Sequence, residues 1–561
     1  MQKIWNFREL DLQKQKTLAA QLGISPIIAQ ILINRGITDA EAAAAFLDCD
    51  MGNCHDPFLL KDMSKAVERI KKAIAYKEKI VVYGDYDVDG LTSCSLLFYA
   101  LSALGADVSC YIPHRIEEGY GVNLQACAGL KEQKTALVIT VDCGISSFQE
   151  VEYLNASGID IIITDHHQPL DDKVPQALCV INPQQKDCKY PYKELAGVGI
   201  AYKLAQGISR GSLDVSEHLD LVALGTISDV AQLTGENRIL VKHGLKVLSQ
   251  TKKIGLRALM DVTGIKKGAL STYHVGFILG PRLNAMGRMG SAEKSLHLLL
   301  SNSYKQSYEL ALALDLENKQ RQKTEQRILK EAMAMVDTEI NFKHHRTVVL
   351  HKDTWHPGVI GIVASRIAER FYRPTILIAT QEGVGKGSGR SIRDFHLFDT
   401  LSKCNHLLEE FGGHENAAGI SILEKNLQNF KDIFNQEACK VLTPEKLRPV
   451  VDIDMEITLG ALSEKLIEEL EKCAPFGMGN PRPVFASRNL KLKQKPRVLR
   501  NSTFKLWLTD ETVTCEALGS RMGDIDVASI TDGLSIVYSP SINNWQGIST
   551  IQLQLKDIQL I

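Results

Sequence analysis

The chain has 561 residues, of which 44% are hydrophobic and 23% charged, and its formal net charge is -1 at pH 7. This length favours several domains, and the neutral charge excludes a global basic field, so any site for a polyanion must be a local patch. No apolar stretch is long enough to span a bilayer and the first residues do not form a secretory signal, so we expect no membrane partner. The twelve cysteines form no Cys-x-x-Cys pair, which argues against a zinc knuckle and favours reduced thiols in a cytoplasmic protein.

Residues 1–60 have a helical apolar pattern without chemical motifs, and we expect a small N-terminal helical cap there. From about residue 63 to residue 230, short apolar runs alternate with helical patterns, which is typical of a doubly wound parallel sheet in an α/β domain. In such sheets, ligands bind beyond the carboxyl ends of the strands. The predicted strands are 80–83, 108–112, 137–141, 159–164 and 178–181.

Acidic side chains and histidines follow three of these strands and one helical segment. Each of them alone is equally compatible with a helix N-cap or a solvated turn. Four such groups at one rim of a sheet are hard to attribute to chance, and a set of carboxylates and imidazoles suits one or two Mn²⁺ or Mg²⁺ ions. The candidate residues are Asp85, Asp87 and Asp89 after the first strand, Asp142 at the third, Asp165, His166 and His167 after the fourth, and Asp229 after residues 219–224.

The motifs Asp-Tyr-Asp-Val-Asp-Gly (85–90), Val-Asp-Cys-Gly (141–144), Asp-His-His (165–167) and Ser-Asp-Val (228–230) resemble the four motifs of the DHH phosphoesterase superfamily. Their order and intervals are similar to those of the RecJ exonucleases. This resemblance implies a metal-dependent exonuclease that degrades single-stranded DNA from 5′ to 3′ into 5′-mononucleotides, in DNA repair and recombination. We expect Asp142 to bridge two ions held also by Asp87, Asp89, His166 and Asp229. Asp85 and His167 are expected to orient these ligands, with His167 as an alternative proton donor to the leaving oxygen.

The middle of the chain supplies candidate contacts to phosphates. Residues 280–289 resemble a RecJ segment along the DNA path, and Arg282, Asn284 and Arg288 are expected to contact DNA from a glycine-rich turn; the alternative is a turn with two solvated arginines. Arg115, after the second predicted strand, is a candidate for the 5′-terminal phosphate. Residues 307–336 predict a long helix between domains, with a solvated polar middle at 317–327.

Two further domains are expected after this helix. Glycine clusters at 385–391 and 411–414 resemble the DHHA1 domain, and Ser388, Arg390 and His414 are expected to hold phosphates. After about residue 448 the strand pattern is compatible with a small barrel of the oligonucleotide-binding (OB) type. Residues 488–505 contain seven basic and no acidic residues, among them Lys491, Lys493 and Lys495. Together with Phe504, Trp507 and Tyr538 they predict a groove for single strands, although the aromatic residues fit a barrel core equally well.

The predicted domains are a helical cap (1–60), a DHH catalytic domain (61–300), a connecting helix (301–340), a smaller α/β DHHA1 domain (341–445) and an OB-like domain (446–561). Two alternatives remain at this stage: a DHH hydrolase of short oligonucleotides or cyclic dinucleotides, and a non-catalytic member that binds replication partners. The former lack the terminal barrel, and the latter are expected to lose acidic ligands. A repair context implies a helicase and a single-strand-binding protein as partners, which the sequence does not name.

Overall fold

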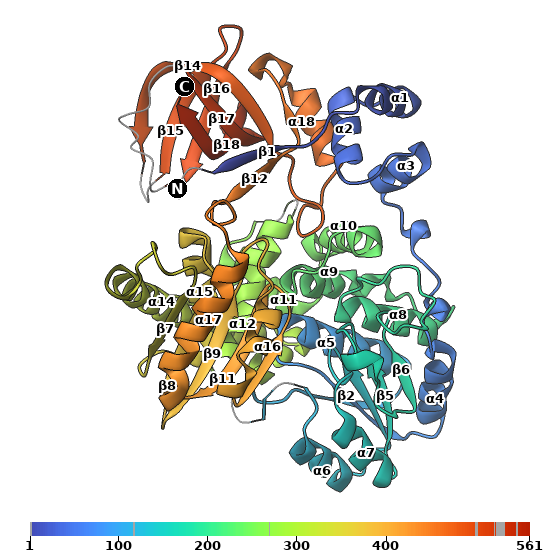
Figure 1. Cartoon of the computed structure of the whole chain (residues 1–561). Helices are drawn as coiled ribbons and strands as arrows, with labels where there is room; N and C mark the ends of the chain where they lie inside the picture. Colours follow the sequence, from blue (N-terminus) through green and yellow to red (C-terminus); the bar gives the residue numbers. More distant parts are fainter. Residues whose placement is uncertain are drawn as a thin grey trace.

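A computed structural model describes residues 3–115, 118–119, 121–266, 268, 270–499, 503–520, 522, 533–545 and 548–560. The chain forms a barrel at the top of Figure 1 and two α/β lobes below it. The first lobe contains a five-stranded sheet in the order β3-β2-β4-β5-β6, in which every neighbouring pair is parallel. Its strands are β2 (Lys79–Tyr83), β3 (Asp107–Tyr111), β4 (Leu137–Val141), β5 (Asp160–Thr164) and β6 (Cys179–Ile181).

Helices cover both faces of this sheet, which confirms the predicted doubly wound fold. Alternate residues of β2 enter two different cores, because successive side chains in a strand point to opposite faces. Ile80 and Val82 pack with α4 (Met63–Ala75), α5 (Val88–Ala103), α8 (Gly197–Ser209) and α9 (Leu219–Ser228). Val81 and Tyr83 pack instead with α6 (Leu124–Glu132) and α7 (Phe148–Ala156).

A helical layer follows, with α10 (Gly235–Ser249), α11 (Ile254–Thr263), the π-helix η5 (His274–Leu279), α12 (Gly280–Met289), α13 (Glu293–Leu300) and α14 (Tyr304–Glu339). The glycine-rich turn expected at 280–289 is therefore wrong, because these residues form helix α12. The solvated middle expected for the long helix is only partly correct, because one face of it is exposed and the other is buried. Arg321 and Glu325 of α14 are buried and paired at 2.9 Å, and Arg366 of the next domain approaches Glu325 at 2.5 Å. Packing on α15 (Pro357–Phe371) buries these charges, and the pairing compensates part of the desolvation.

The second lobe has a five-stranded sheet in the order β10-β11-β9-β8-β7. The glycines at 385–389 lie within strand β9 and not in a phosphate-binding loop. A Cβ at Gly387 would lie 2.6 Å from Ile420 Cγ1, so glycine lets the neighbouring apolar side chains close over the strand. The strands are β7 (Val348–Lys352), β8 (Thr375–Gln381), β9 (Val384–Arg390), β10 (Glu410–Gly413) and β11 (Ala417–Leu423), with helices α15, α16 (Leu397–Lys403) and α17 (Leu427–Val441).

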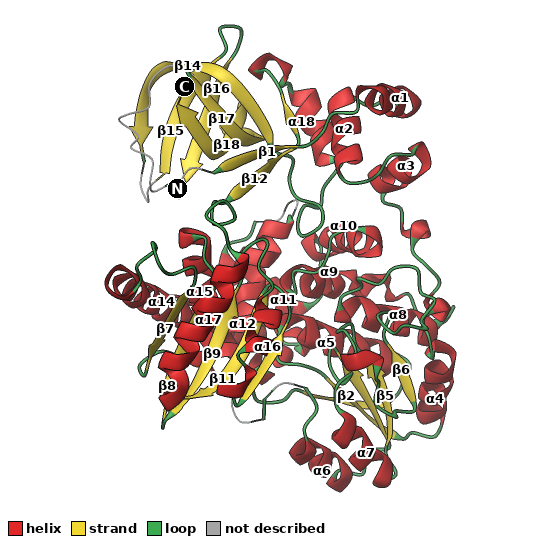
Figure 2. Ribbon diagram, in the orientation of Figure 1, coloured by secondary structure: helices red, strands yellow, loops and turns green. Residues whose placement is uncertain are grey.

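The C-terminal strands close into a barrel, because β14 pairs with both β15 and β17. The N-terminal segment belongs to the same lobe. Strand β1 (Ile4–Phe7), where helix was expected, pairs in parallel with β12 (Val450–Ile453), and helices α1 (Leu12–Leu22), α2 (Pro26–Asn34) and α3 (Ala40–Asp48) share a core with the barrel (Figure 2). The remaining elements are β13 (Met455–Glu456), α18 (Glu464–Glu471), β14 (Phe485–Val498), β15 (Thr503–Thr509), β16 (Thr514–Ser520), β17 (Leu534–Trp545) and β18 (Ile548–Leu560).

Within the described ranges, no single helix has the length and apolar character to cross a membrane; the pair α1 and α2, bent by 115°, meets that test only when the two helices are combined.

Candidate functional site

The side chains predicted to surround a metal lie together at the carboxyl ends of the first sheet. They fall into three groups, and within each group the candidate ligand atoms lie within 4.8 Å of one another. Asp142 and His166 each belong to two of the groups, so the groups form one continuous cluster. The three groups are Asp142 with His166 and His167, Asp89 with His166 and Asp229, and Asp85 with Asp87 and Asp142.

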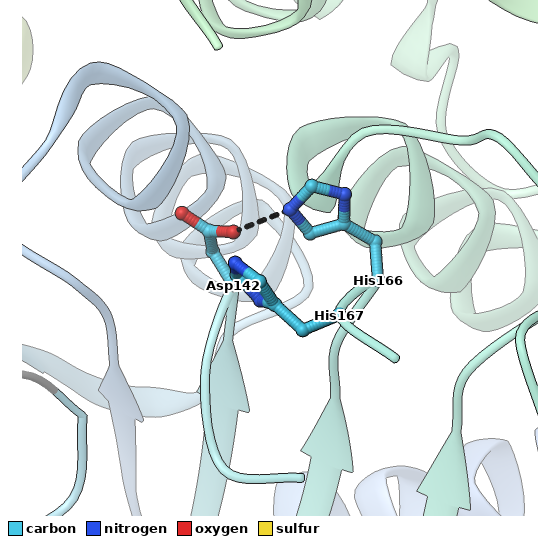
Figure 3. Close-up of side chains that lie close together, drawn as sticks. All are labelled: Asp142, His166 and His167. Atoms are coloured by element: carbon cyan, nitrogen blue, oxygen red, sulfur yellow. Dashed lines mark ion pairs between the residues drawn. The ribbon is translucent and has the colours of Figure 1, made fainter. Parts of the chain in front are cut away.

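We name this set of candidate ligand side chains the metal cluster, and Asp142 and His166 form its centre. His166 Nε2 lies 3.1 Å from Asp142 Oδ1, the contact marked by the dashed line in Figure 3. It lies 4.0 Å from Asp229 Oδ2. The backbone of Asp142 has a φ of 59°, a left-handed conformation that is unfavourable for most side chains and recurs at functional sites. The strand end thus turns sharply and directs the Asp142 carboxylate into the cluster.

Asp165, the first residue of the Asp-His-His triplet, organises the loop that carries the two histidines. Its buried carboxylate accepts hydrogen bonds from the backbone N–H groups of Ile145, His166 and His167, and lies 2.7 Å from His167 Nδ1. Although burial opposes it, the hydrogen bond with Asp165 raises the pKa of His167 to about 9. Burial and the neighbouring His167 lower the pKa of His166 to about 4, so His166 is neutral and has a lone pair to donate.

Backbone amides fix the carboxylates of the first motif. Asp87 Oδ1 caps helix α5 by accepting from the N–H groups of Asp89 and Gly90, at 2.8 and 3.1 Å. The two oxygens of Asp89 accept from Gly197 and Val198, at 2.7 and 2.8 Å, at the N-terminus of α8. A Cβ at Gly197 would lie 2.8 Å from Asp142 Cβ, so this helix end can approach the cluster only as glycine. Sequence analysis did not identify Gly197, because no local pattern links it to residues 89 and 142.

The residues present fit a divalent cation. Burial and mutual repulsion raise the pKa of Asp85, Asp142 and Asp229, and raise that of Asp89 to about 7. Among the described residues, the buried Asp85 Oδ1 has no hydrogen-bond partner, and the buried His166 Nε2 has none besides the Asp142 oxygen that it faces at 3.1 Å. Such atoms are costly to bury unless a ligand satisfies them. Carboxylate oxygens with one or two imidazole nitrogens are a donor set suited to Mn²⁺ or Mg²⁺.

Stabilisation of the protein by Mn²⁺ is expected to be small near pH 5 and large near pH 7.5. An acid whose pKa is raised on folding keeps its proton in the folded state, so the stability it contributes is present at low pH and is lost as pH rises through the raised value, about 7 for Asp89. The cation competes with these protons, so its effect grows over the same interval.

The measurement is urea unfolding with Mn²⁺ or EDTA at about pH 5 and about pH 7.5. Subtracting the free energy of unfolding in EDTA from that in Mn²⁺ cancels the contribution of titrating groups that the ion does not contact. An Mn²⁺ effect of the same size at both pH values would contradict the predicted proton competition.

A cavity of about 690 Å³ lies between the first lobe and the second. Arg115 and Arg288 line it from one side, and Lys386 with residues of β10 and the middle of β11 from the other. Burial and the neighbouring cations Arg115, Arg321 and Arg390 lower the pKa of Arg288 to about 10. Such crowded cations favour the binding of an anion, and we name Arg115, Arg288 and Arg390 the arginine cluster. The sequence pattern did not reveal Lys386 or the buried Arg321.

The other residues that were predicted to contact phosphate lie in different environments. Arg282 Nε donates to Asp315 at 2.9 Å, and its contact with phosphate remains a prediction. Asn284 Oδ1 accepts from the N–H of Val88, so Asn284 supports the first acidic motif. Ser388 Oγ accepts from Arg390 Nη1 at 3.1 Å. His414 is exposed in the turn between β10 and β11 and does not line the cavity.

Several basic residues of the run at 488–505 are paired with acidic residues that lie outside the run. Lys491 pairs with Glu511, and Arg488 and Lys505 pair with Glu456 and Glu516 from neighbouring strands. Within the described residues, Lys493 and Lys495 form no ion pair and lie exposed on β14. Trp507 is half-buried with the Arg497 guanidinium 5.2 Å from its ring. Phe504 and Tyr538 belong to the barrel core and not to a stacking surface; Arg500 lies outside the described residues.

Comparison with known proteins identifies the family. The model of the DHH family, N-terminal domain, matches residues 79–226, the DHHA1 domain matches 344–440 and the RecJ OB domain matches 453–557. The single-stranded-DNA-specific exonuclease RecJ of Bacillus subtilis is 40% identical over 557 residues, which cover 99% of this chain and 70% of that relative. The chain belongs to the RecJ family. The predicted domain boundaries contain these matches but remain predictions.

Solved RecJ structures extend the likeness to the whole fold. The crystal structure of RecJ in complex with Mn²⁺ from Thermus thermophilus has a TM-score of 0.86 and 30% identity, covering 99% of this chain and 79% of that one. For the Mg²⁺ complex of RecJ from the same organism, the TM-score is 0.80 at 29% identity, with coverage of 99% and 78%. RecJ proteins with either ion therefore share the fold that assembles the metal cluster described here.

Proposed function

We propose that this chain is a metal-dependent exonuclease that degrades single-stranded DNA from 5′ to 3′ and releases 5′-mononucleotides. The observation that carries the proposal is the cluster of buried carboxylates and histidines, with unsatisfied donor atoms, next to a cavity rich in arginine. Membership of the RecJ family supports the DNA substrate. The barrel and the retained acidic residues favour this function over hydrolysis of very short oligonucleotides and over a non-catalytic role.

The proposed ligands of one or two Mn²⁺ or Mg²⁺ ions are Asp87, Asp89, Asp142, His166 and Asp229, with Asp85 beside them. The chemistry that such ions supply when bound is activation of a water and stabilisation of charge on the phosphate. Asp142 belongs to two ligand groups, and its two carboxylate oxygens would suit it to a shared position between two ions; His166 would offer one lone pair to a single ion. The hydrogen bond with Asp165 holds His167 in place, and the pKa of His167 is raised. His167 therefore carries a proton that it can donate to the leaving oxygen.

The arginine cluster is the proposed site for the 5′-terminal phosphate. Arg115 stacks over the Tyr86 ring at 4.8 Å, and this contact positions its guanidinium beside the first acidic motif. A guanidinium binds phosphate oxygens in a bidentate geometry, so the cluster fixes both charge and orientation. Holding the end of the strand next to the metal cluster would release one nucleotide at a time, which is the property that makes a nuclease an exonuclease.

Digestion of the same single strand labelled at its 5′ or its 3′ end tests this function. With Mn²⁺ we expect immediate release of a labelled mononucleotide from the 5′-labelled strand and progressive shortening of the 3′-labelled strand. EDTA is expected to stop both, and a duplex of the same sequence serves as the control substrate. First release from the 3′ end, equal degradation of the duplex or full activity in EDTA would contradict the proposal.

The biological setting is also a proposal. All twelve cysteines are free thiols, which supports a reducing compartment such as the cytoplasm. A nuclease specific for single strands needs a source of them, so a helicase is a proposed partner, together with a single-strand-binding protein that coats the product.

A further inference from the structure

Two aromatic side chains lie exposed on the segment that packs against helix α9. Tyr273 and Phe277 are 60% and 72% exposed, and their rings stack with centroids 5.2 Å apart and planes at 25°. Single exposed apolar residues are ordinary in proteins. Because both rings remain open to solvent, neither contributes the stability that its burial would give.

The segment that carries the two rings packs against helix α9, and the proposed ligand Asp229 directly follows that helix. Phe277 lies in the π-helix η5, an element that occurs frequently at functional sites. A Cβ at Gly276 would lie 3.8 Å from Ile227 Cγ2, and one at Gly280 would lie 2.6 Å from Ser228 Oγ. Since Asp229 follows Ser228 directly, the end of helix α9 contacts the segment with the aromatic pair and also leads into a residue of the metal cluster.

One helical surface connects the barrel with the cavity. At its start, Thr272 Oγ1 donates to the carbonyl of Phe476 in the turn that precedes the barrel strands, at 2.8 Å. Further along, Asn284 contacts the first acidic motif and Arg288 lines the cavity. Phe277, Asn284 and Arg288 follow one another, seven and four residues apart, along the continuous helical segment formed by η5 and α12. At 1.5 Å per residue, Phe277 lies about 10 Å along the axis from Asn284.

We propose that Tyr273 and Phe277 form a platform on which nucleobases of the single strand stack between the barrel and the metal cluster. This inference rests on the proposed function. Aromatic faces hold bases without regard to sequence, because every base has a π face. The aromatic platform therefore complements the arginine cluster, which contacts phosphates. A nucleobase is favoured over a protein surface as the occupant because the platform lies on the surface that continues into the cavity.

Binding of a fluorescent single strand of about 20 nucleotides in EDTA tests the platform, because this length exceeds the roughly 4–16 nucleotides that one OB fold covers. Tyr273→Leu/Phe277→Leu keeps apolar bulk but removes both π faces. We expect this double variant to bind at least about tenfold more weakly, equivalent to ~1.4 kcal/mol. The slope of log K against log salt should not change, because no phosphate contact is lost.

The matched control is Tyr304→Leu/Tyr308→Leu, which removes a second exposed stacked pair on α14 and should bind as the wild type does. Hydrolysis of a 5′-phosphorylated dinucleotide, too short to reach the platform, should be retained by both double variants. This measurement shows that the metal cluster remains folded when binding of the long strand is weakened.

A strand with consecutive abasic residues completes the test as a double-mutant cycle. The wild type should lose affinity for the abasic strand, and the Tyr273/Phe277 double variant should lose little more. An unchanged affinity of that variant for the normal strand, or equal losses on both strands, would overturn the platform while leaving the exonuclease intact. A wild type that neither binds nor degrades single strands would overturn the proposed function together with the platform.

Discussion

Asp142→Asn is expected to lower kcat on single-stranded DNA by more than about 100-fold, the upper limit for loss of an outer partner of a metal ligand. Asp142 belongs to two of the three ligand groups, and its oxygen lies 3.1 Å from His166 Nε2. Asparagine keeps the shape but removes the charge that attracts a cation. Exposed Asp187, which pairs with Lys61 away from the cluster, provides the control Asp187→Asn.

The same variant should be at least as stable as the wild type when metal is absent. Burial and the neighbouring carboxylates Asp89, Asp87 and Asp229 raise the pKa of Asp142, so its charged form destabilises the metal-free fold. Thermal unfolding with and without Mn²⁺ measures both effects: the Tm in EDTA should not fall, and the gain in Tm with Mn²⁺ should shrink. Full Mn²⁺-dependent activity of Asp142→Asn, or an undiminished gain in Tm, would contradict the role given to Asp142.

Sequence alone predicted the metal cluster because its geometry follows from topology. Once the runs before Asp85, Asp142 and His166 are taken as parallel strands, their carboxyl ends coincide, and side chains far apart in the chain meet. The prediction needed only strand direction and residue type. The prediction did not use the position of the helices, so it did not include Gly197, on which the close approach of α8 depends.

The expectations that the structure modifies depend on contacts that a local sequence pattern does not reveal. The basic run at 488–505 contains no acid, yet Glu511 in the adjacent turn pairs with Lys491, and Glu516 on the adjacent strand pairs with Lys505. The polar middle of α14 has the pattern of a solvated helix, but Arg366, supplied by the second lobe, approaches Glu325 there. A helical pattern likewise cannot separate an exposed ring such as Phe277 from a buried one, because burial depends on what packs against it.

Arg288→Ala is expected to lower kcat/KM on 5′-phosphorylated single strands by about 100-fold, the equivalent of ~3 kcal/mol and the upper range for a hydrogen bond to a charged group. Arg288 lies within the arginine cluster, and burial and its neighbours Arg115, Arg321 and Arg390 lower its pKa to about 10. The loss should be much smaller on a strand that ends in a 5′-hydroxyl, since that strand lacks the phosphate the cluster binds. Exposed Arg393, which pairs with Asp452 at 3.4 Å, is the matched control as Arg393→Ala.

Removing Arg288 should also relieve repulsion among the cations that remain. In the absence of DNA, the free energy of unfolding of Arg288→Ala should therefore fall less than truncation of a buried side chain ordinarily costs. Inorganic phosphate is expected to raise the Tm of the wild type by occupying the cluster, and it should raise that of the variant less. Equal effects of the substitution on 5′-phosphate and 5′-hydroxyl strands, with an unchanged phosphate-dependent Tm, would mean that the cluster does not hold the terminal phosphate. A selective loss on the phosphorylated strand would instead tie the choice of strand end to the meeting of the two lobes, because the cluster has members on both.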